Sequence, residues 1–214
     1  MIVLRRTGKF GDYYGSPYNA SLACTYEQMS LNAKYIYSYL TKEGWTINAI
    51  SALLGNMQAE SSINPGRWQS DRVGGDPYAH GYGMVQWTPY TKYTEWCSSQ
   101  GYSDPSEMDS NLARIMYEVK NNIQWIGTGS YYGMSFKEFS ESTQSVRSLA
   151  IGFLLCYERP ADQSVDVQNY RASLAEAWYT YLTGVTPVDP STGSNKKKKG
   201  YKFILFNKRR KIYG

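Results

Sequence analysis

The sequence has few of the residues that bind metal ions or cross-link small domains. Its 214 residues include one histidine, His80, and three cysteines, Cys24, Cys97 and Cys156, which are odd in number and widely spaced. A structural zinc site needs closely spaced Cys and His residues, and a disulfide framework needs an even set of cysteines. We therefore expect no disulfide framework, no metal site and no cofactor.

Long hydrophobic runs are also missing. The longest apolar stretch lies around Leu149 to Tyr157, far short of the roughly 20 residues with which a helix crosses a bilayer. The N-terminus, Met1-Ile-Val-Leu-Arg-Arg, has no apolar core after its charges. We expect no transmembrane segment and no Sec signal.

Acidic residues are absent from the last twenty positions. Nine of the 23 Lys and Arg residues lie between Asn195 and Gly214, which leaves fourteen bases in the rest of the chain against all 18 acids. The body therefore offers no uniformly basic face for nucleic acid, and any weak contact with a polyanion should be made by the tail. A solvated linker end is the alternative interpretation of this segment.

The hydrophobic residues that are present, 42% of the chain, favour a folded domain in water. We predict an N-terminal arm over residues 1–27 with one strand at Ile2 to Leu4, a helical domain over 28–184, and a Pro/Gly/Ser linker with the basic tail over 185–214. Apolar spacing and capping residues predict helices over 29–43, 47–61, 89–99, 105–122, 135–142, 145–157 and 164–182.

Two features of this pattern are specific enough to test. Thr88-Pro89 and Asp104-Pro105 each offer an N-cap and a first helical residue for the helix that follows. Between Asn64 and Gln86 the composition changes to Gly, Pro, Asp and Tyr, which predicts loops or a short hairpin.

The segment that carries most functional information is Gly55-Asn-Met-Gln-Ala-Glu60-Ser61-Ser-Ile-Asn64-Pro65. It places Glu60 in the last turn of a helix, beside the loop-rich stretch. Desolvation at such a cleft raises the pKa of a carboxylic acid, so that the acid keeps its proton near neutral pH. Glycosidic cleavage needs that proton, because the leaving oxygen must be protonated. The alternative is an ordinary solvated Glu, which the helix dipole disfavours by only a few tenths of a kcal/mol.

A second motif, Gly81-Tyr-Gly-Met-Val-Gln86-Trp87, follows about twenty residues later. Glu-Ser-x-x-Asn-Pro followed by Gly-Tyr-Gly-Met-Val-Gln resembles the catalytic helix end and loop of soluble lytic transglycosylases and goose-type lysozymes. Trp68-Gln69, Gln86-Trp87-Thr-Pro89 and Tyr157-Glu-Arg-Pro160 extend the resemblance, roughly from Met29 to Gly184, to the phage tail lysozyme domain of small podophages. It implies a mainly α, α+β lysozyme-like fold with a small hairpin or loop lobe across a cleft, and Glu60 as the catalytic acid.

Candidates for a second carboxylate lie in the loop that should face Glu60. Asp71 and Asp76 could each stabilise an oxocarbenium ion or position a water molecule, but both also fit ordinary turn positions in Asp71-Arg-Val-Gly-Gly-Asp76-Pro. If neither acts, a mechanism with Glu60 alone remains, in which the sugar's own N-acetyl or 6-hydroxyl group assists.

Substrate binding should involve Gln86, whose amide can both donate to and accept from an N-acetyl group. The rings of Trp68, Tyr82, Trp87 and Tyr90 are candidate faces for sugar rings, and we expect two of these four to be exposed in the cleft. Glu158 and Arg159 fit a buried pair that orients the cleft floor.

The resemblance implies cleavage of the β-1,4 bond between N-acetylmuramic acid and N-acetylglucosamine, by hydrolysis or by anhydro-forming transglycosylation. The implied partners are peptidoglycan glycan strands and other phage tail proteins, and the implied location is the virion tail tip, acting on the host wall. A non-catalytic tail or wall-binding module that kept the fold is the alternative.

Overall fold

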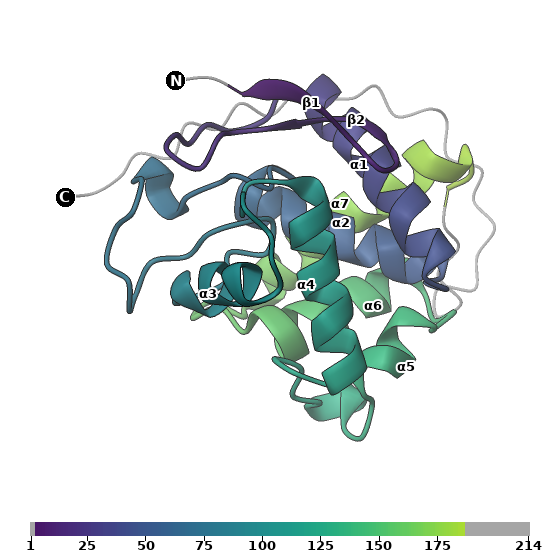
Figure 1. The fold of residues 1–214 in the computed structure, drawn as a ribbon. Coiled ribbons are helices and arrows are strands. Elements are labelled where there is room, and N and C mark those ends of the chain that lie inside the picture. The colour runs from purple at the N-terminus through teal and green to yellow at the C-terminus, as the bar shows by residue number, and fades with distance from the viewer. Residues whose placement is uncertain (1–2, 187–214) are drawn as a thin grey trace.

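The computed structural model describes residues 3–186, in which helices dominate and a small two-stranded sheet lies at the N-terminal end (Figure 1). This arrangement confirms the predicted mainly α fold. The strands are β1 (Leu4–Gly8) and β2 (Gly11–Gly15), and the α-helices are α1 (Tyr26–Lys42), α2 (Ile47–Ser61), α3 (Thr91–Ser99), α4 (Met108–Asn121), α5 (Phe136–Ser140), α6 (Val146–Phe153) and α7 (Val165–Thr183). Three single turns complete the set: η1 (Gln69–Asp71), η2 (Gly129–Tyr131) and η3 (Leu154–Glu158).

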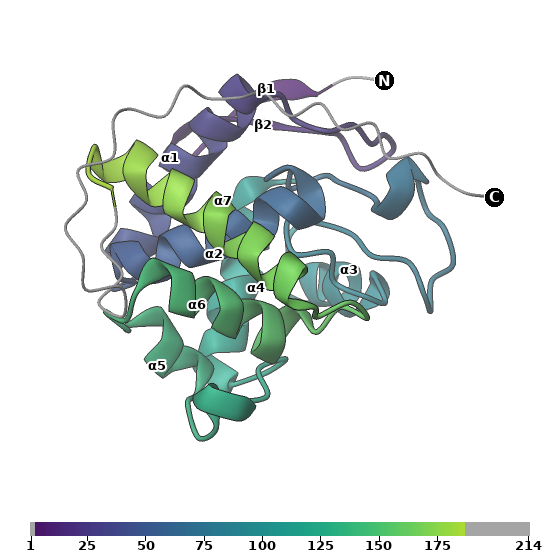
Figure 2. The same cartoon turned by 180° about the vertical axis from the view of Figure 1, so that it is seen from behind.

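Helix α2 lies at the centre of the fold and carries Glu60 in its last turn, as predicted. The Thr46 side chain caps its start by accepting a hydrogen bond of 3.1 Å from the Ala49 N–H, which satisfies a backbone donor that has no partner inside the helix. Ile50 and Leu53 are fully buried, and α2 packs against both α6 and α7 (Figure 2). The helix that positions Glu60 is therefore held along most of its length by core packing.

Helices α2 and α7 approach closely at Gly55. A Cβ atom added there would lie 2.6 Å from the backbone nitrogen of Ala175, so only glycine permits this crossing. Glu60 lies five residues after Gly55, and Arg171 lies four residues before Ala175. The close crossing therefore brings these two side chains together at one end of the helix pair.

Helix α6 follows its predicted start but not its predicted end. The Ser145 side chain caps it by accepting from the Ser148 N–H at 3.1 Å, and the α-helix ends at Phe153 rather than at Tyr157. The chain continues as one π-helical turn, η3, and leaves it at Arg159 in the left-handed conformation, with φ 47°. A π turn widens the helix by one residue and is frequent at functional sites.

The N-terminal arm forms a hairpin rather than a single strand. Strands β1 and β2 pair antiparallel from Leu4 opposite Gly15 to Gly8 opposite Gly11, and β2 packs on α1. Asn32 of α1 accepts a 2.6 Å hydrogen bond from the Tyr14 N–H and donates one of 2.8 Å to its carbonyl oxygen. Helix α1 begins three residues before the predicted Met29, because Thr25 and Gln28 form a capping box.

Both Pro-based predictions of helix starts are wrong by two or three residues. Helix α3 begins at Thr91, since the Thr88 hydroxyl donates to the Gln86 carbonyl oxygen at 3.0 Å instead of capping the helix. Helix α4 begins at Met108, since the Asp104 carboxylate accepts from the Ser106 N–H at 2.8 Å and so forms a local turn.

Residues 62–90 form a lobe of loops at one side of the helices (Figure 1). No hairpin forms in this segment; two isolated bridges, Trp68 with Tyr82 and Tyr82 with Trp87, tie its two halves together.

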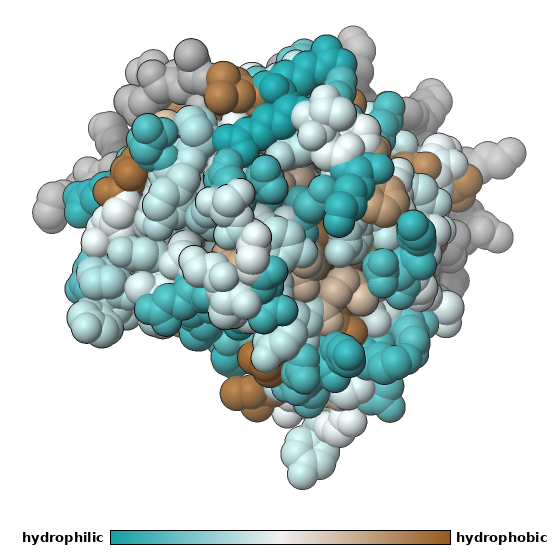
Figure 3. Space-filling model, viewed as in Figure 1, coloured by the Kyte–Doolittle hydropathy of each residue, from teal (hydrophilic) through white to brown (hydrophobic). Residues whose placement is uncertain are grey.

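The face in Figure 3 is mostly polar or neutral, with small, separate hydrophobic spots. Within residues 3–186, no helix is long and apolar enough to cross a membrane. The predicted linker and basic tail lie outside the described residues from position 187 onward.

Candidate active site

An open pocket of about 260 Å³ lies where the end of α2, the loop lobe and the end of η3 meet. It joins three segments that are far apart in the sequence, and it contains three of the predicted site residues, Glu60, Trp68 and Gln86. The residues that line it are Glu60, Arg67, Trp68, Gln69, Ser70, Gln86, Thr88, Glu158 and Pro160.

Glu60 reaches this pocket from α2 and is held there by Arg171 of α7. The side chain of Glu60 is 20% exposed and that of Arg171 is 9% exposed, and the two form an ion pair through Glu60 Oε1. Arg171 also donates to the Asn56 carbonyl oxygen at 3.0 Å. The guanidinium therefore fixes the carboxylate relative to its own helix.

Arg171 was not among the residues predicted for the site, although the sequence contains a signal for it. Arg171, Ala175 and Trp178 recur at helical spacing and are all buried on one face of α7. A cation on a core-facing stripe needs an acidic partner, because burying an unpaired charge is costly. That argument predicts a partner for Arg171 but not that the partner is Glu60.

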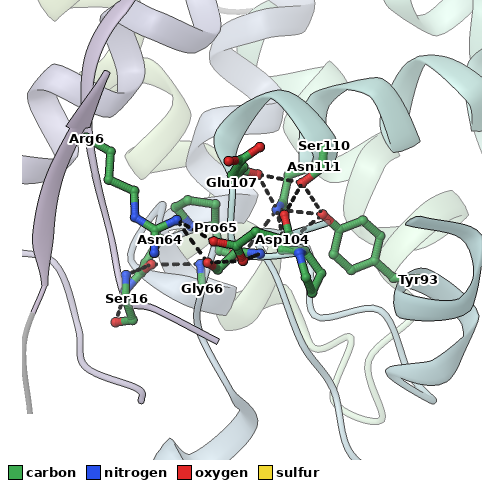
Figure 4. Close-up of polar contacts among 12 residues, drawn as sticks. Arg6, Ser16, Asn64, Pro65, Gly66, Tyr93, Asp104, Glu107, Ser110 and Asn111 are labelled. Atoms are coloured by element: carbon green, nitrogen blue, oxygen red, sulfur yellow. Dashed lines mark hydrogen bonds and ion pairs between the residues drawn. The ribbon is translucent and has the colours of Figure 1, made fainter. Parts of the chain in front are cut away.

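Ser61 and Asn64 of the Glu-Ser-x-x-Asn-Pro motif hold the loops around the pocket. The Ser61 hydroxyl donates to the Met84 carbonyl oxygen at 2.8 Å, which ties the end of α2 to the second motif. Asn64 accepts from the Ser16 and Gly66 N–H groups at 3.0 and 2.9 Å (Figure 4). It also donates to the Leu22 carbonyl oxygen at 2.6 Å. These two residues have a structural role that the motif alone did not reveal.

Asn111 of α4 continues this support from the other side. Its side-chain oxygen accepts from the Met84 N–H at 3.1 Å. Its amide nitrogen donates to the Pro65 carbonyl oxygen at 3.3 Å (Figure 4). One fully buried side chain thus joins the segment that follows Glu60 to the segment that precedes Gln86.

Gln86 lines the pocket with a backbone φ of 50°, a conformation that is uncommon for residues other than glycine. Its side-chain nitrogen donates to the carbonyl oxygens of Arg67 and Gly83 at 3.1 and 2.8 Å. Both amide hydrogens therefore serve the loop, and the side-chain oxygen remains as the group that can accept from a ligand.

The prediction that two of the four candidate rings are exposed is wrong. Trp68, Tyr82 and Trp87 are 1%, 0% and 3% exposed, and Tyr90 is half-buried. Trp87 donates to the buried Glu118 carboxylate at 3.0 Å, which fixes its ring inside the core. Trp68 alone of the four lines the pocket, so aromatic residues in this segment mainly build the lobe.

The two aspartates of the loop are engaged elsewhere. Asp71 forms an ion pair with Arg67 at 3.0 Å and accepts from the Ser21 hydroxyl at 2.7 Å. Asp76 accepts from the Tyr78 N–H at 2.9 Å in an exposed turn. Neither lines the pocket around Glu60, although Asp71 positions Arg67, which does.

Glu158 and Arg159 do not form the predicted pair. The Arg159 guanidinium donates to the backbone carbonyl oxygens of Gln124 and Cys156, while Glu158 lines the pocket with Glu60. Burial raises the pKa of Glu158 well above its usual range, and the negative charge of Glu60 adds to this effect. Within residues 3–186, no cluster of three or more His, Cys, Asp or Glu side chains is suited to a metal ion.

Residues 31–182 of this chain match the sequence model of the phage tail lysozyme family. This span includes every element of the pocket. The chain belongs to the phage tail lysozyme family. It is also 47% identical over 167 residues to Morphogenesis protein 1 of Bacillus phage B103, in an alignment that covers 78% of this chain and 43% of that relative. The resemblance inferred from the motifs is therefore confirmed, and the chain spans less than half the length of this phage relative.

Proposed function

We propose that the chain cleaves the glycan strands of peptidoglycan at the β-1,4 bond between N-acetylmuramic acid and N-acetylglucosamine, with Glu60 as the general acid. The observation that carries this proposal is the position of Glu60 in an open pocket, fixed by Arg171, inside the span matched by the phage tail lysozyme family. A carboxyl in this position can approach the oxygen of a bound glycoside and protonate it as the bond breaks.

The other residues of the pocket have parts in this proposal that follow from their contacts. The free side-chain oxygen of Gln86 accepts from the N–H of an N-acetyl group, while its two donors keep the loop rigid. Trp68, which is 1% exposed, forms part of the pocket wall. Arg67, held by Asp71, places a cation at the rim, which attracts the carboxylates of peptidoglycan.

The proposal for the place of action rests on the family rather than on the pocket. The family is named for the phage tail, and the relative in phage B103 is named for morphogenesis. We propose that this chain is carried at the tail tip of a virion, in contact with other tail proteins, and opens the host wall locally during infection.

Replacement of Glu60 tests this function. Glu60→Gln is nearly isosteric but cannot donate a catalytic proton, so we expect a folded protein that no longer releases soluble glycan from purified walls. Glu141→Gln is the matched control, because it makes the same change of charge at an exposed ion pair on the surface. Lysis by a well-folded Glu60→Gln protein at the rate of the unchanged chain would contradict the assignment.

A further inference from the structure

A second carboxyl, Glu158, lies in the pocket and has no part in the function proposed above. It ends the π turn η3, and both of its neighbours are fixed. The Tyr157 ring stacks on Phe153 with centroids 4.5 Å apart, and its hydroxyl donates to Glu118. On the other side Arg159 is anchored to two backbone carbonyl oxygens. The backbone therefore holds Glu158 at the pocket wall.

The side chain of Glu158 is placed unlike that of an ordinary surface acid. Its Oε1 atom is buried and has no hydrogen-bond partner within residues 3–186. A buried carboxylate without partners is costly, whereas the protonated acid carries no charge and can donate a hydrogen bond. The position thus favours the neutral form of this group.

The charges that face Glu158 act on it in both directions. They are the carboxylates of Glu60 on α2 and Glu118 on α4, and the guanidiniums of Arg171 on α7 and of Arg159 beside it. Arg171 is already bonded to Glu60 and to a carbonyl oxygen, and Arg159 is bonded to carbonyl oxygens. A further cation at the pocket, Arg67, is paired with Asp71. Each of these cations has at least one partner, although the buried Nη1 atom of Arg67 has none. Arg171 and Arg159 lower the pKa of Glu158, but burial and the neighbouring carboxylates outweigh them.

We infer that Glu158 is the second functional carboxyl of this site and that it shares its proton with Glu60 in the pocket that both residues line. Two neighbouring carboxyls resist double ionisation, so the last proton is released at a higher pH than from either group alone. The inference rests on the proposed function for the use of that proton. During cleavage Glu60 passes it to the leaving oxygen, and the electron pair of the broken C–O bond forms the O–H bond. The attacking water or sugar hydroxyl later returns a proton to the pair.

The variant Glu158→Gln separates this role from a structural one. With Gln at 158 the site has lost the carboxyl that holds the proton, and the other carboxyl that lines the pocket, Glu60, is paired with Arg171. We expect the alkaline limb of the pH–rate profile to move to lower pH by about one unit or more, the size of coupling at which two sites titrate as a pair. A purely structural role would lower the rate at every pH without moving the limb. Glu141→Gln should leave the profile unchanged.

A titration of the carboxyl groups by NMR, on the full chain with ¹³C-labelled glutamate, tests the shared proton without requiring cleavage. We expect one carboxyl to titrate well above the usual range and its signal to be lost in Glu158→Gln. In Glu60→Gln the same carboxyl should titrate at lower pH, because a negative neighbour is gone. If Glu158→Gln does not fold, the titration of Glu60→Gln still tests the shared proton.

The outcomes distinguish this inference from the proposed function. A wild-type chain that cleaves glycan, but in which no carboxyl titrates at high pH and the profile of Glu158→Gln is unchanged, overturns the inference alone. A chain that shows the coupled titration but releases no glycan overturns the proposed function and leaves the shared proton established.

Discussion

At the scale of single residues, the site depends on how each carboxylate is partnered. Glu60 has one cation, Arg171, and faces an open pocket. Asp71 has Arg67 and the Ser21 hydroxyl, and Asp76 caps a turn. Glu158 has a buried oxygen without a partner. The same chemical group therefore serves as a candidate acid, an anchor, a turn residue and a proton holder, depending on its contacts.

The loop aspartates give a direct prediction at this scale. Because neither lines the pocket, we expect Asp76→Asn to keep near-full activity and Asp71→Asn to lose less than about tenfold, through a looser Arg67. The rate of glycan release by each purified variant measures this. Removal of one preorganised stabilising group lowers the rate on the order of 10²-fold or more. A rate loss of that size in either variant would show that the replaced aspartate is the second carboxylate of the mechanism.

At the scale of elements, the crossing of α2 and α7 sets the geometry of the site. Gly55 permits the contact with Ala175, and Glu60 and Arg171 meet one turn beyond it. The π turn η3 positions Glu158 in the same way, because Glu158 is its last residue. Each of these carboxyls thus lies at a helix end that is fixed by packing, and not on a flexible loop.

The variant Gly55→Ala tests the role of this crossing. The added methyl group would overlap the backbone of α7, and overpacking of this kind costs about 1–3 kcal/mol of the free energy of unfolding. We expect a lower midpoint in chemical denaturation and reduced activity, because the helices must move apart at the Glu60 end. Ser173→Ala, on the exposed face of α7, should change stability by less than about 0.5 kcal/mol. Wild-type stability in Gly55→Ala would show that the crossing tolerates a side chain.

Much of this element pattern could be predicted from the sequence, because it is local. Thr46 as a cap, the apolar stripe of α2 and Gly184 as the end of α7 are read from neighbouring residues, and Glu60 follows from them. The Glu60–Arg171 pair could not be predicted, since it joins residues 111 positions apart. Nor could the burial of Tyr82 and Trp87, because an aromatic residue in a Gly-rich loop fits a sugar platform and a core equally well until its packing is known.

At the scale of the whole molecule, the pocket is lined by residues from α2, the loop lobe, η3 and Pro160, and Arg171 of α7 holds Glu60 in it. These residues are spread from Glu60 to Arg171. A chain that stops after Gly184 keeps all of them. We therefore expect this truncated chain to cleave small soluble glycan fragments at the full rate. Binding to anionic walls should weaken at low salt, and the difference should shrink near 0.15 M salt, where the screening length is about 8 Å. Loss of fragment cleavage on truncation would show that residues beyond Gly184 support the fold.

The central claim is that this chain itself breaks a glycosidic bond through Glu60. Mass spectrometry of a defined, peptide-free glycan strand, incubated with the purified chain, tests it most directly. The account predicts shortened strands with new N-acetylmuramic acid ends, either reducing ends or 1,6-anhydro ends that lack one water, and no shortening with Glu60→Gln. Strands that stay intact with the folded wild-type chain, or that shorten equally with Glu60→Gln, would contradict it.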